Sequence, residues 1–305
     1  MQLVENISMS SENPFVQREG CVRPFLARPW SEVAFLLLAR FIIISALFVL
    51  VLLVGNVAWD GFSRLTWSFF TSFPSRKAEN AGIFAAWTGS LWLLLLTVLF
   101  ALPIGVGAAV YLEEYARKNR FTRLVELCIA NLAGVPSVIY GLLGLQVFVR
   151  ALSFERSVLS GALTLSLLVL PIIIMASREA LKTVPKGYRE GALALGATKW
   201  QTTYTQVLPA ALPGIATGCI LAFSRAIGET APLVTLGALT YVARVPDSLF
   251  APFTALPIQA FNWLSRPQTE FHVNAAAAIT ILLSFMIVLN LAAIGLRAKF
   301  QKRQR

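Results

Sequence analysis

Charged residues are scarce in this sequence, since Asp, Glu, Lys and Arg make up only 13% of its 305 residues. Soluble globular domains contain about 25% of these residues. Apolar residues make up 57% instead, and the mean hydropathy is +0.70. The composition therefore excludes an ordinary soluble protein and predicts a chain that lies mostly within lipid.

Cysteine and histidine are rare as well. The three cysteines, Cys21, Cys128 and Cys219, are far apart and form no CxxC pair, which argues against a disulfide framework and against a metal site. The single histidine, His272, has no clustered ligands, and no HExxH motif occurs. We therefore expect no metal and no other cofactor in this chain.

Sequence motifs for catalysis are also missing. There is no GxxxxGKS/T phosphate loop, so we expect the chain not to bind ATP by that route. No serine stands in a G-x-S-x-G setting with a base nearby, which disfavours an intramembrane hydrolase. The interpretation is that this chain is not an enzyme.

The sequence is nevertheless basic, with a net charge of +11. The basic residues lie in short loops between apolar segments and not on a soluble face with interleaved aromatics, so we expect no nucleic acid partner. Lys and Arg are concentrated in both terminal tails and in the loops after the second and fourth apolar segments. Cytoplasmic loops of membrane proteins are enriched in Lys and Arg, so this distribution predicts that both termini are cytoplasmic.

Six apolar segments are long enough to cross a hydrocarbon core, which needs about 20 helical residues. The sequence thus predicts an all-α, polytopic membrane helix bundle. A cytoplasmic N-terminal segment (1–40) and a basic cytoplasmic tail (297–305) would flank the transmembrane domain (41–296). The apolar run begins only near Ala34, too late for a cleaved signal. The expected spans are Phe41–Val57, Trp87–Tyr111, Leu124–Val149, Val158–Met175, Leu212–Tyr241 and Val273–Leu296.

The segment between the fourth and fifth spans, residues 179–209, is unusually long and is called the coupling loop below. A helix-forming stretch from Tyr188 follows Pro185, Gly196 can adopt a left-handed conformation, and Thr198 can cap a second helix. The pattern predicts a helix, a glycine turn and a second helix. We expect Glu190 in the first turn of the first helix, where the helix dipole stabilises its negative charge.

An arginine and a glutamate, Arg225 and Glu229, lie four residues apart within the fifth span. Ionisable residues in a membrane span are costly and indicate function by default. A guanidinium suits phosphate because its fixed donors can bind two oxygens at once. We interpret Glu229 as the resting partner of Arg225; alternatively, the two charges only neutralise each other. Gly228 and Pro232 predict a kink or break beside the pair.

Polar residues near this pair complete a candidate substrate path. Thr230 follows the pair directly, and three residues of the third span could add hydrogen bonds. Ordinary bonding between helices is the alternative for those three. They are Asn131, Ser137 and Tyr140.

The coupling loop resembles the cytoplasmic signature of permease subunits of ABC importers, in which Glu-Ala-Ala, Gly and Leu-Pro stand at fixed spacing. The matching residues are Glu190, Gly191, Ala192, Gly196, Leu208 and Pro209. Gly191 replaces an alanine of that pattern, and Gln206 replaces an aliphatic residue. Four further segments resemble the phosphate-specific permeases of this family: LPIGVGAAVYLEEYA (102–116), NLAGVPSVIYGLLGL (131–145), SRAIGETAPL (224–233) and PFTALPIQAFNW (252–263).

The resemblance implies a type I ABC importer permease in the bacterial inner membrane, with the coupling loop in a groove of an ATPase. It also implies a homologous PstC-like permease subunit, two PstB-like ATPase subunits that bind the ATP, and an extracytoplasmic PstS-like phosphate-binding protein. Sulfate or molybdate remains an alternative substrate. An ATP-independent anion channel is a further alternative, which the coupling loop disfavours.

Overall fold

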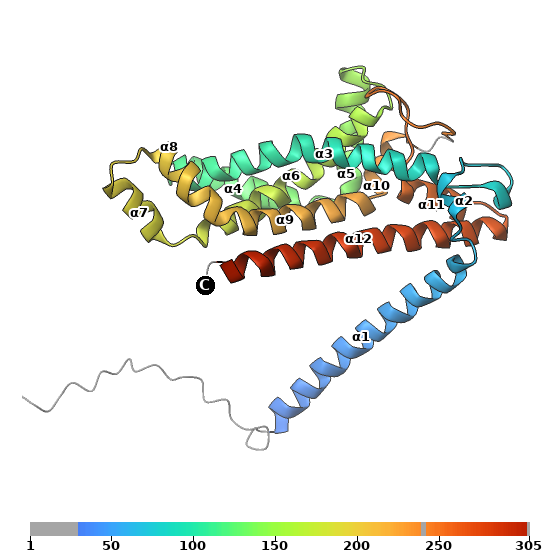
Figure 1. Cartoon of the computed structure of the whole chain (residues 1–305), viewed down its shortest axis with the longest axis horizontal. Helices are drawn as coiled ribbons and strands as arrows, with labels where there is room; N and C mark the ends of the chain where they lie inside the picture. Colours follow the sequence, from blue (N-terminus) through green and yellow to red (C-terminus); the bar gives the residue numbers. More distant parts are fainter. Residues whose placement is uncertain (1–29, 239–241, 304–305) are drawn as a thin grey trace, which may run out of the picture. The chain divides into compact units, whose positions relative to one another are not determined.

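The computed structural model describes residues 30–238 and 242–303, and these residues are almost entirely helical (Figure 1). They contain no β-strand, only one isolated bridge between Ser157 and Pro252. The all-α prediction is therefore confirmed. The helices are α1 (Trp30–Phe62), α2 (Trp67–Thr71), α3 (Phe84–Val110), α4 (Arg120–Ala133), α5 (Ser137–Gly144), α6 (Val158–Lys182), α7 (Lys186–Ala194), α8 (Lys199–Thr202), α9 (Leu208–Gly228), α10 (Ala231–Leu236), α11 (Leu256–Leu264) and α12 (Thr269–Arg303).

The chain divides into two units, residues 1–53 and 54–305. The described part of the first unit is the start of α1, and none of its side chains is buried. The second unit holds all the other helices and three single π turns, which continue α3, α5 and α8. These π turns are Tyr111–Tyr115, Leu145–Ala151 and Thr203–Val207.

Five helical segments among the described residues are long and apolar enough to cross a membrane, and a bent pair of helices is the sixth candidate span. The bent pair consists of Arg120–Ala133 and Ser137–Ala151, which meet at an angle of 101°. The straight segments are Trp30–Phe62, Phe84–Tyr115, Val158–Lys182, Lys199–Gly228 and Thr269–Lys299.

Two expected spans differ in shape from the prediction. The third, Leu124–Val149, is not one helix, because Pro136 lacks an N–H and restricts the residue before it to extended backbone. The fifth ends at Gly228 and does not continue as one helix, so the expected break beside Glu229 is confirmed. Its expected end at Tyr241 lies outside the described residues. The first helix begins at Trp30, before the expected Phe41.

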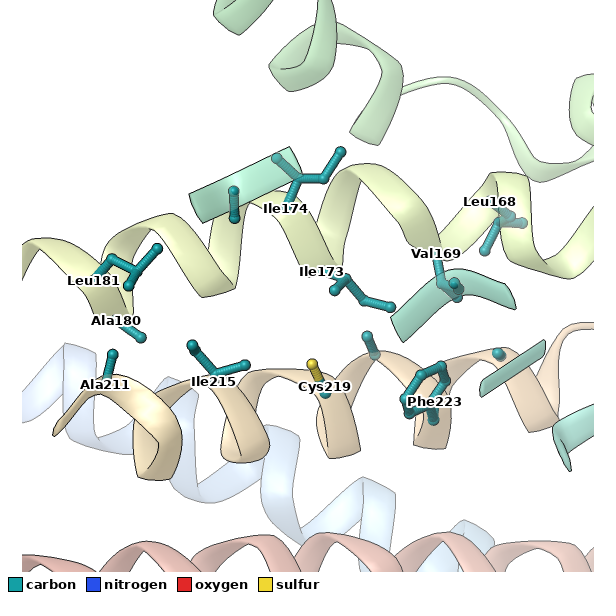
Figure 2. Packing of buried hydrophobic residues seen from close by; sticks show 14 of the residues in the cluster. Leu168, Val169, Ile173, Ile174, Ala180, Leu181, Ala211, Ile215, Cys219 and Phe223 are labelled. Carbon is teal, nitrogen blue, oxygen red and sulfur yellow. The ribbon is translucent and has the colours of Figure 1, made fainter. Parts of the chain in front are cut away.

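The core of the second unit lies along α6, which packs between α3 and α9. Figure 2 shows Ile173 and Ala180 on the side of α6 that faces Ala211, Ile215 and Cys219 of α9. Small residues bring the backbones close together, as is usual for membrane helices. A Cβ atom at Gly218 would lie 2.6 Å from the Cβ of Ala176, and one at Gly105 of α3 would lie 2.6 Å from Ile173 Cγ2.

The contact between α5 and α10 is tight enough to predict a mutational effect. A Cβ atom at Gly141 would lie 1.8 Å from Thr235 Oγ1 and 2.7 Å from Pro232 Cα. Gly141→Ala is therefore expected to destabilise the protein by about 1–3 kcal/mol through overpacking. Thermal unfolding of the purified protein in detergent measures this loss of stability. Gly107→Ala is the matched control, because a Cβ atom at Gly107 meets nothing within 4 Å, and an equal loss in both variants would contradict the prediction.

Candidate functional site

The coupling loop folds as a helix, a glycine turn and a second helix, so this prediction is confirmed. Helix α7 ends at Ala194, and Gly196 adopts a left-handed conformation with φ of 85°. The backbone N–H of Gly196 donates to Leu193 O at 3.0 Å, which is typical of a glycine C-terminal cap. Thr198 caps α8 in a reciprocal capping box with Gln201.

Two details of the loop differ from the prediction. Pro185 is the N-terminal cap of α7, so the helix begins at Lys186 and includes Gly187. Glu190 consequently lies in the second turn and not in the first, where the helix dipole would act on it. Residues 179–182 of the coupling loop belong to α6.

The loop presents apolar side chains among exposed polar ones. Leu195 is 91% exposed, and Tyr188, Leu193 and Trp200 are more than half exposed. Glu190 and Gly191 are exposed, and Ala192 is half-buried. Exposed large apolar residues can belong to an interaction surface. The docking of this loop on another protein stays a prediction.

The π turn Thr203–Val207 accounts for the polar Gln206. A π turn inserts one extra residue into a helix and rotates the residues around it. Gln206 is exposed as a result, and Val207, the next residue, is fully buried. Val207 thus supplies the buried apolar side chain that the motif has at the position of Gln206. Leu208, half-buried, and Pro209, exposed, then form the first turn of α9.

Sequence reasoning missed a network of ion pairs beneath the coupling loop. Arg189 of α7 pairs with Glu114 at the end of α3, with Nη2 2.7 Å from Oε1. Arg178 of α6 pairs with Glu126 of α4 at 2.7 Å and with Glu113 at 3.5 Å. The sequence did contain one indication of these ion pairs, because Glu113 and Glu114 stand at the end of an apolar run, where buried carboxylates need partners.

The charged pair in the fifth span forms an ion pair at the end of α9. Arg225 Nε lies 3.3 Å from Glu229 Oε1, and the side chains are 57% and 17% exposed. The helix ends at Gly228, and Glu229 has extended backbone. Within the described part of the chain, the other guanidinium donors of Arg225 make no hydrogen bond. The guanidinium therefore binds Glu229 through Nε, and its other nitrogen atoms have no hydrogen-bond partner among the described residues.

The other expected path residues lie in different settings. Thr230 lines an apolar hollow of about 410 Å³ beside the helix break, together with Gly228. The hydroxyl of Tyr140 donates to Leu132 O at 2.7 Å and so closes the bend between α4 and α5. Asn131 is exposed, and Ser137 is half-buried at the start of α5. No hydrogen bond within residues 30–238 joins these last three residues to the charged pair.

The hydrogen bond of Tyr140 gives a test of its role. Tyr140→Phe should lower the stability of the purified protein by about 1 kcal/mol, because it removes one hydrogen bond at the bend. Transport per assembled complex should remain unchanged if the bond only closes the bend. A loss of transport at unchanged stability would instead place the hydroxyl in the substrate path.

Residues 101–305 match the family model described as "Binding-protein-dependent transport system inner membrane component". The chain belongs to this family. Its members are membrane components of transport systems, so the chain is a multi-pass inner-membrane protein and a permease subunit.

Named relatives within the family cover most of both chains. A probable ABC transporter permease protein, YqgI of Bacillus subtilis, is 32% identical over 84% of this chain and 91% of the relative. The phosphate transport system permease protein PstA 1 of Mycobacterium tuberculosis is also 32% identical, over 81% of this chain and 80% of the relative. The PstA protein of Haemophilus influenzae is 31% identical over 82% and 87%.

Solved structures show the same fold at low sequence identity. A bacterial ABC transporter that imports alginate aligns over 88% of this chain and 98% of its own, with a TM-score of 0.60 and 16% identity. The MetNI methionine ABC transporter aligns over 71% and 94%, with a TM-score of 0.55 and 18% identity. The predicted fold of a type I ABC importer permease is confirmed.

Proposed function

We propose that this chain is one permease half of an ATP-driven phosphate importer. The observation that carries the proposal is the guanidinium of Arg225, which lies at the end of a membrane helix with donors free to bind an anion. Relatives that are named phosphate transport permeases and cover about four fifths of the chain support phosphate as the cargo.

The proposed partners come from the resemblance to phosphate permeases. The chain pairs with a homologous PstC-like permease around a central path, receives phosphate from a PstS-like extracytoplasmic binding protein, and docks on PstB-like ATPase subunits. ATP is bound and hydrolysed on those subunits and not on this chain. Both termini lie in the cytoplasm, which places the coupling loop on the same side as the ATPase.

Arg225 and Glu229 act as a pair during transport. Glu229 holds the guanidinium through Nε and leaves the other donors to the incoming anion. A phosphate that binds there makes two parallel, charge-assisted hydrogen bonds to the planar fork. The nearby negative charge of Glu229 weakens this binding, so that phosphate can leave again. A transport site needs such a balance because tight binding would stop turnover.

The coupling loop connects this site to the ATPase. Its second helix continues without a gap through the π turn into α9, so residues 199–228 are one helical segment with Arg225 near its end. A movement imposed on α7 and α8 by the ATPase therefore reaches the guanidinium through a single rigid element.

Substrate competition tests the proposed cargo. Uptake of radioactive phosphate by the reconstituted complex with its binding protein should be blocked by excess unlabelled phosphate and unaffected by equal concentrations of sulfate or molybdate. Stronger competition by sulfate or molybdate than by phosphate would assign the chain to another oxyanion.

A further inference from the structure

Three consecutive residues at the end of α3 contact four other elements. Glu113 pairs with Arg178 of α6, which also holds Glu126 of α4. Glu114 pairs with Arg189 of α7. The Tyr115 hydroxyl donates to Thr203 Oγ1 at 3.5 Å, and the Lys199 ammonium lies 5.2 Å from the Tyr115 ring centroid. These residues close a single π turn, a feature that is frequent at functional sites.

The pair between Glu114 and Arg189 is the most highly constrained of these contacts. Arg189 donates from Nε to Glu114 Oε1 at 3.1 Å and from Nη2 to the same oxygen at 2.7 Å. It also donates to Leu181 O of α6 at 3.0 Å and to Val184 O, just after the end of α6, at 2.8 Å. The side chains are only 23% and 9% exposed. One guanidinium therefore fastens α7 to both α3 and α6.

The position of this contact distinguishes it from an ordinary surface ion pair. Lys182 and Glu179 form such a pair nearby, at 2.7 Å within the single helix α6, with side chains 45% and 72% exposed. Exposed pairs of that kind contribute little to stability. The pair of Glu114 and Arg189 joins residues 75 positions apart, is largely buried, and connects α7 of the coupling loop to another part of the chain.

The geometry links the loop to the membrane helices in two ways. The chain itself continues from α8 into α9, and the ion pair ties α7 to α3. Helix α3 packs against α6 along its length, with Gly105 in close contact with Ile173. A movement of α7 therefore reaches α3 through the ion pair, while α9 is reached through the chain itself.

We propose that Glu114 and Arg189 are positioning residues that transmit movement of the coupling loop into α3. This proposal rests on the proposed function, because it assumes that an ATPase drives the loop. Without the pair, α7 would still dock on the ATPase, but ATP hydrolysis would move the loop without closing the membrane helices. ATP would then be hydrolysed without a corresponding transport of phosphate.

The test measures ATP hydrolysis and phosphate uptake separately in the reconstituted full complex. In Glu114→Gln, which keeps the shape of the side chain but removes its charge, phosphate uptake per ATP hydrolysed should fall about tenfold. Glu114→Asp keeps the charge but shortens the side chain, so it should show an intermediate loss. Glu179→Gln, in the exposed pair of α6, is the matched control and should keep the wild-type ratio.

Each result is informative. An unchanged ratio of uptake to hydrolysis in assembled Glu114→Gln complexes would overturn the proposal, because the pair would then only stabilise the fold. Failure of both Glu114 variants to assemble would overturn it for the same reason. Failure of the proposed function would look different, since the wild-type complex itself would then show no ATP-driven phosphate uptake.

Discussion

Replacing Arg225 by alanine is expected to lower ATP-driven phosphate uptake about 100-fold in complexes that still assemble. Hydrogen bonds to charged groups contribute about 1.5–3 kcal/mol each, and two such bonds from one guanidinium amount to at least about 3 kcal/mol. Each 1.4 kcal/mol corresponds to a factor of about ten. The side chain is 57% exposed and, among the described residues, bonds to Glu229 alone, so its loss should leave the helix bundle folded. Uptake by proteoliposomes, normalised to assembled complex, measures the effect.

Two companion variants identify the chemistry at this position. Arg225→Lys keeps the charge but lacks the planar fork, so it should recover only part of the uptake. Glu229→Gln removes the charge of the resting partner and should reduce uptake less than Arg225→Ala does. Loss of assembly in Arg225→Ala would contradict the transport role and would show that the two charges tie the fold together.

Gly196→Pro should abolish ATP-driven uptake by uncoupling the loop from the ATPase. Gly196 has φ of 85°, whereas proline is restricted to about −65°. Proline also removes the N–H that donates to Leu193 O. A cost of about 3 kcal/mol or more corresponds to a loss of at least about 100-fold. Co-purification with the ATPase and uptake measure the loss, and Glu190→Ala should also weaken association.

Two alanine variants separate the effect of backbone conformation from the effect of volume. A Cβ atom at Gly196 meets nothing within 4 Å, so Gly196→Ala should cost only about 1–2 kcal/mol from the left-handed backbone. Gly187→Ala has equal space but lies within helical α7, so it should retain association and uptake. Normal uptake in Gly196→Pro would contradict the docking role of the turn.

Features governed by local rules could be predicted from the sequence. The left-handed Gly196, the cap at Thr198 and the break beside Glu229 each depend on a few neighbouring residues with strong backbone preferences. The pairing of Arg225 with Glu229 is equally local, since four residues separate them. The family signature could also be recognised from the sequence, because it consists of a few residue types at fixed spacing within the coupling loop.

Features that depend on tertiary contacts could not be predicted. Nothing in the sequence pairs Glu114 with Arg189, because 75 residues separate them. Pro136 explains why the helix breaks before α5, but the angle of 101° between the two helices is not determined by the local sequence. The start of α7 at Lys186, which moves Glu190 out of the first turn, reflects how weakly helix ends are determined by sequence alone.

The most direct test of the account is phosphate uptake by proteoliposomes that contain this chain, its permease and ATPase partners and the binding protein, with and without ATP. The account predicts accumulation of phosphate with ATP, and none without ATP or with an ATPase that cannot hydrolyse it. A steady anion current through vesicles that contain this chain alone, without any ATPase, would contradict the account and identify a channel.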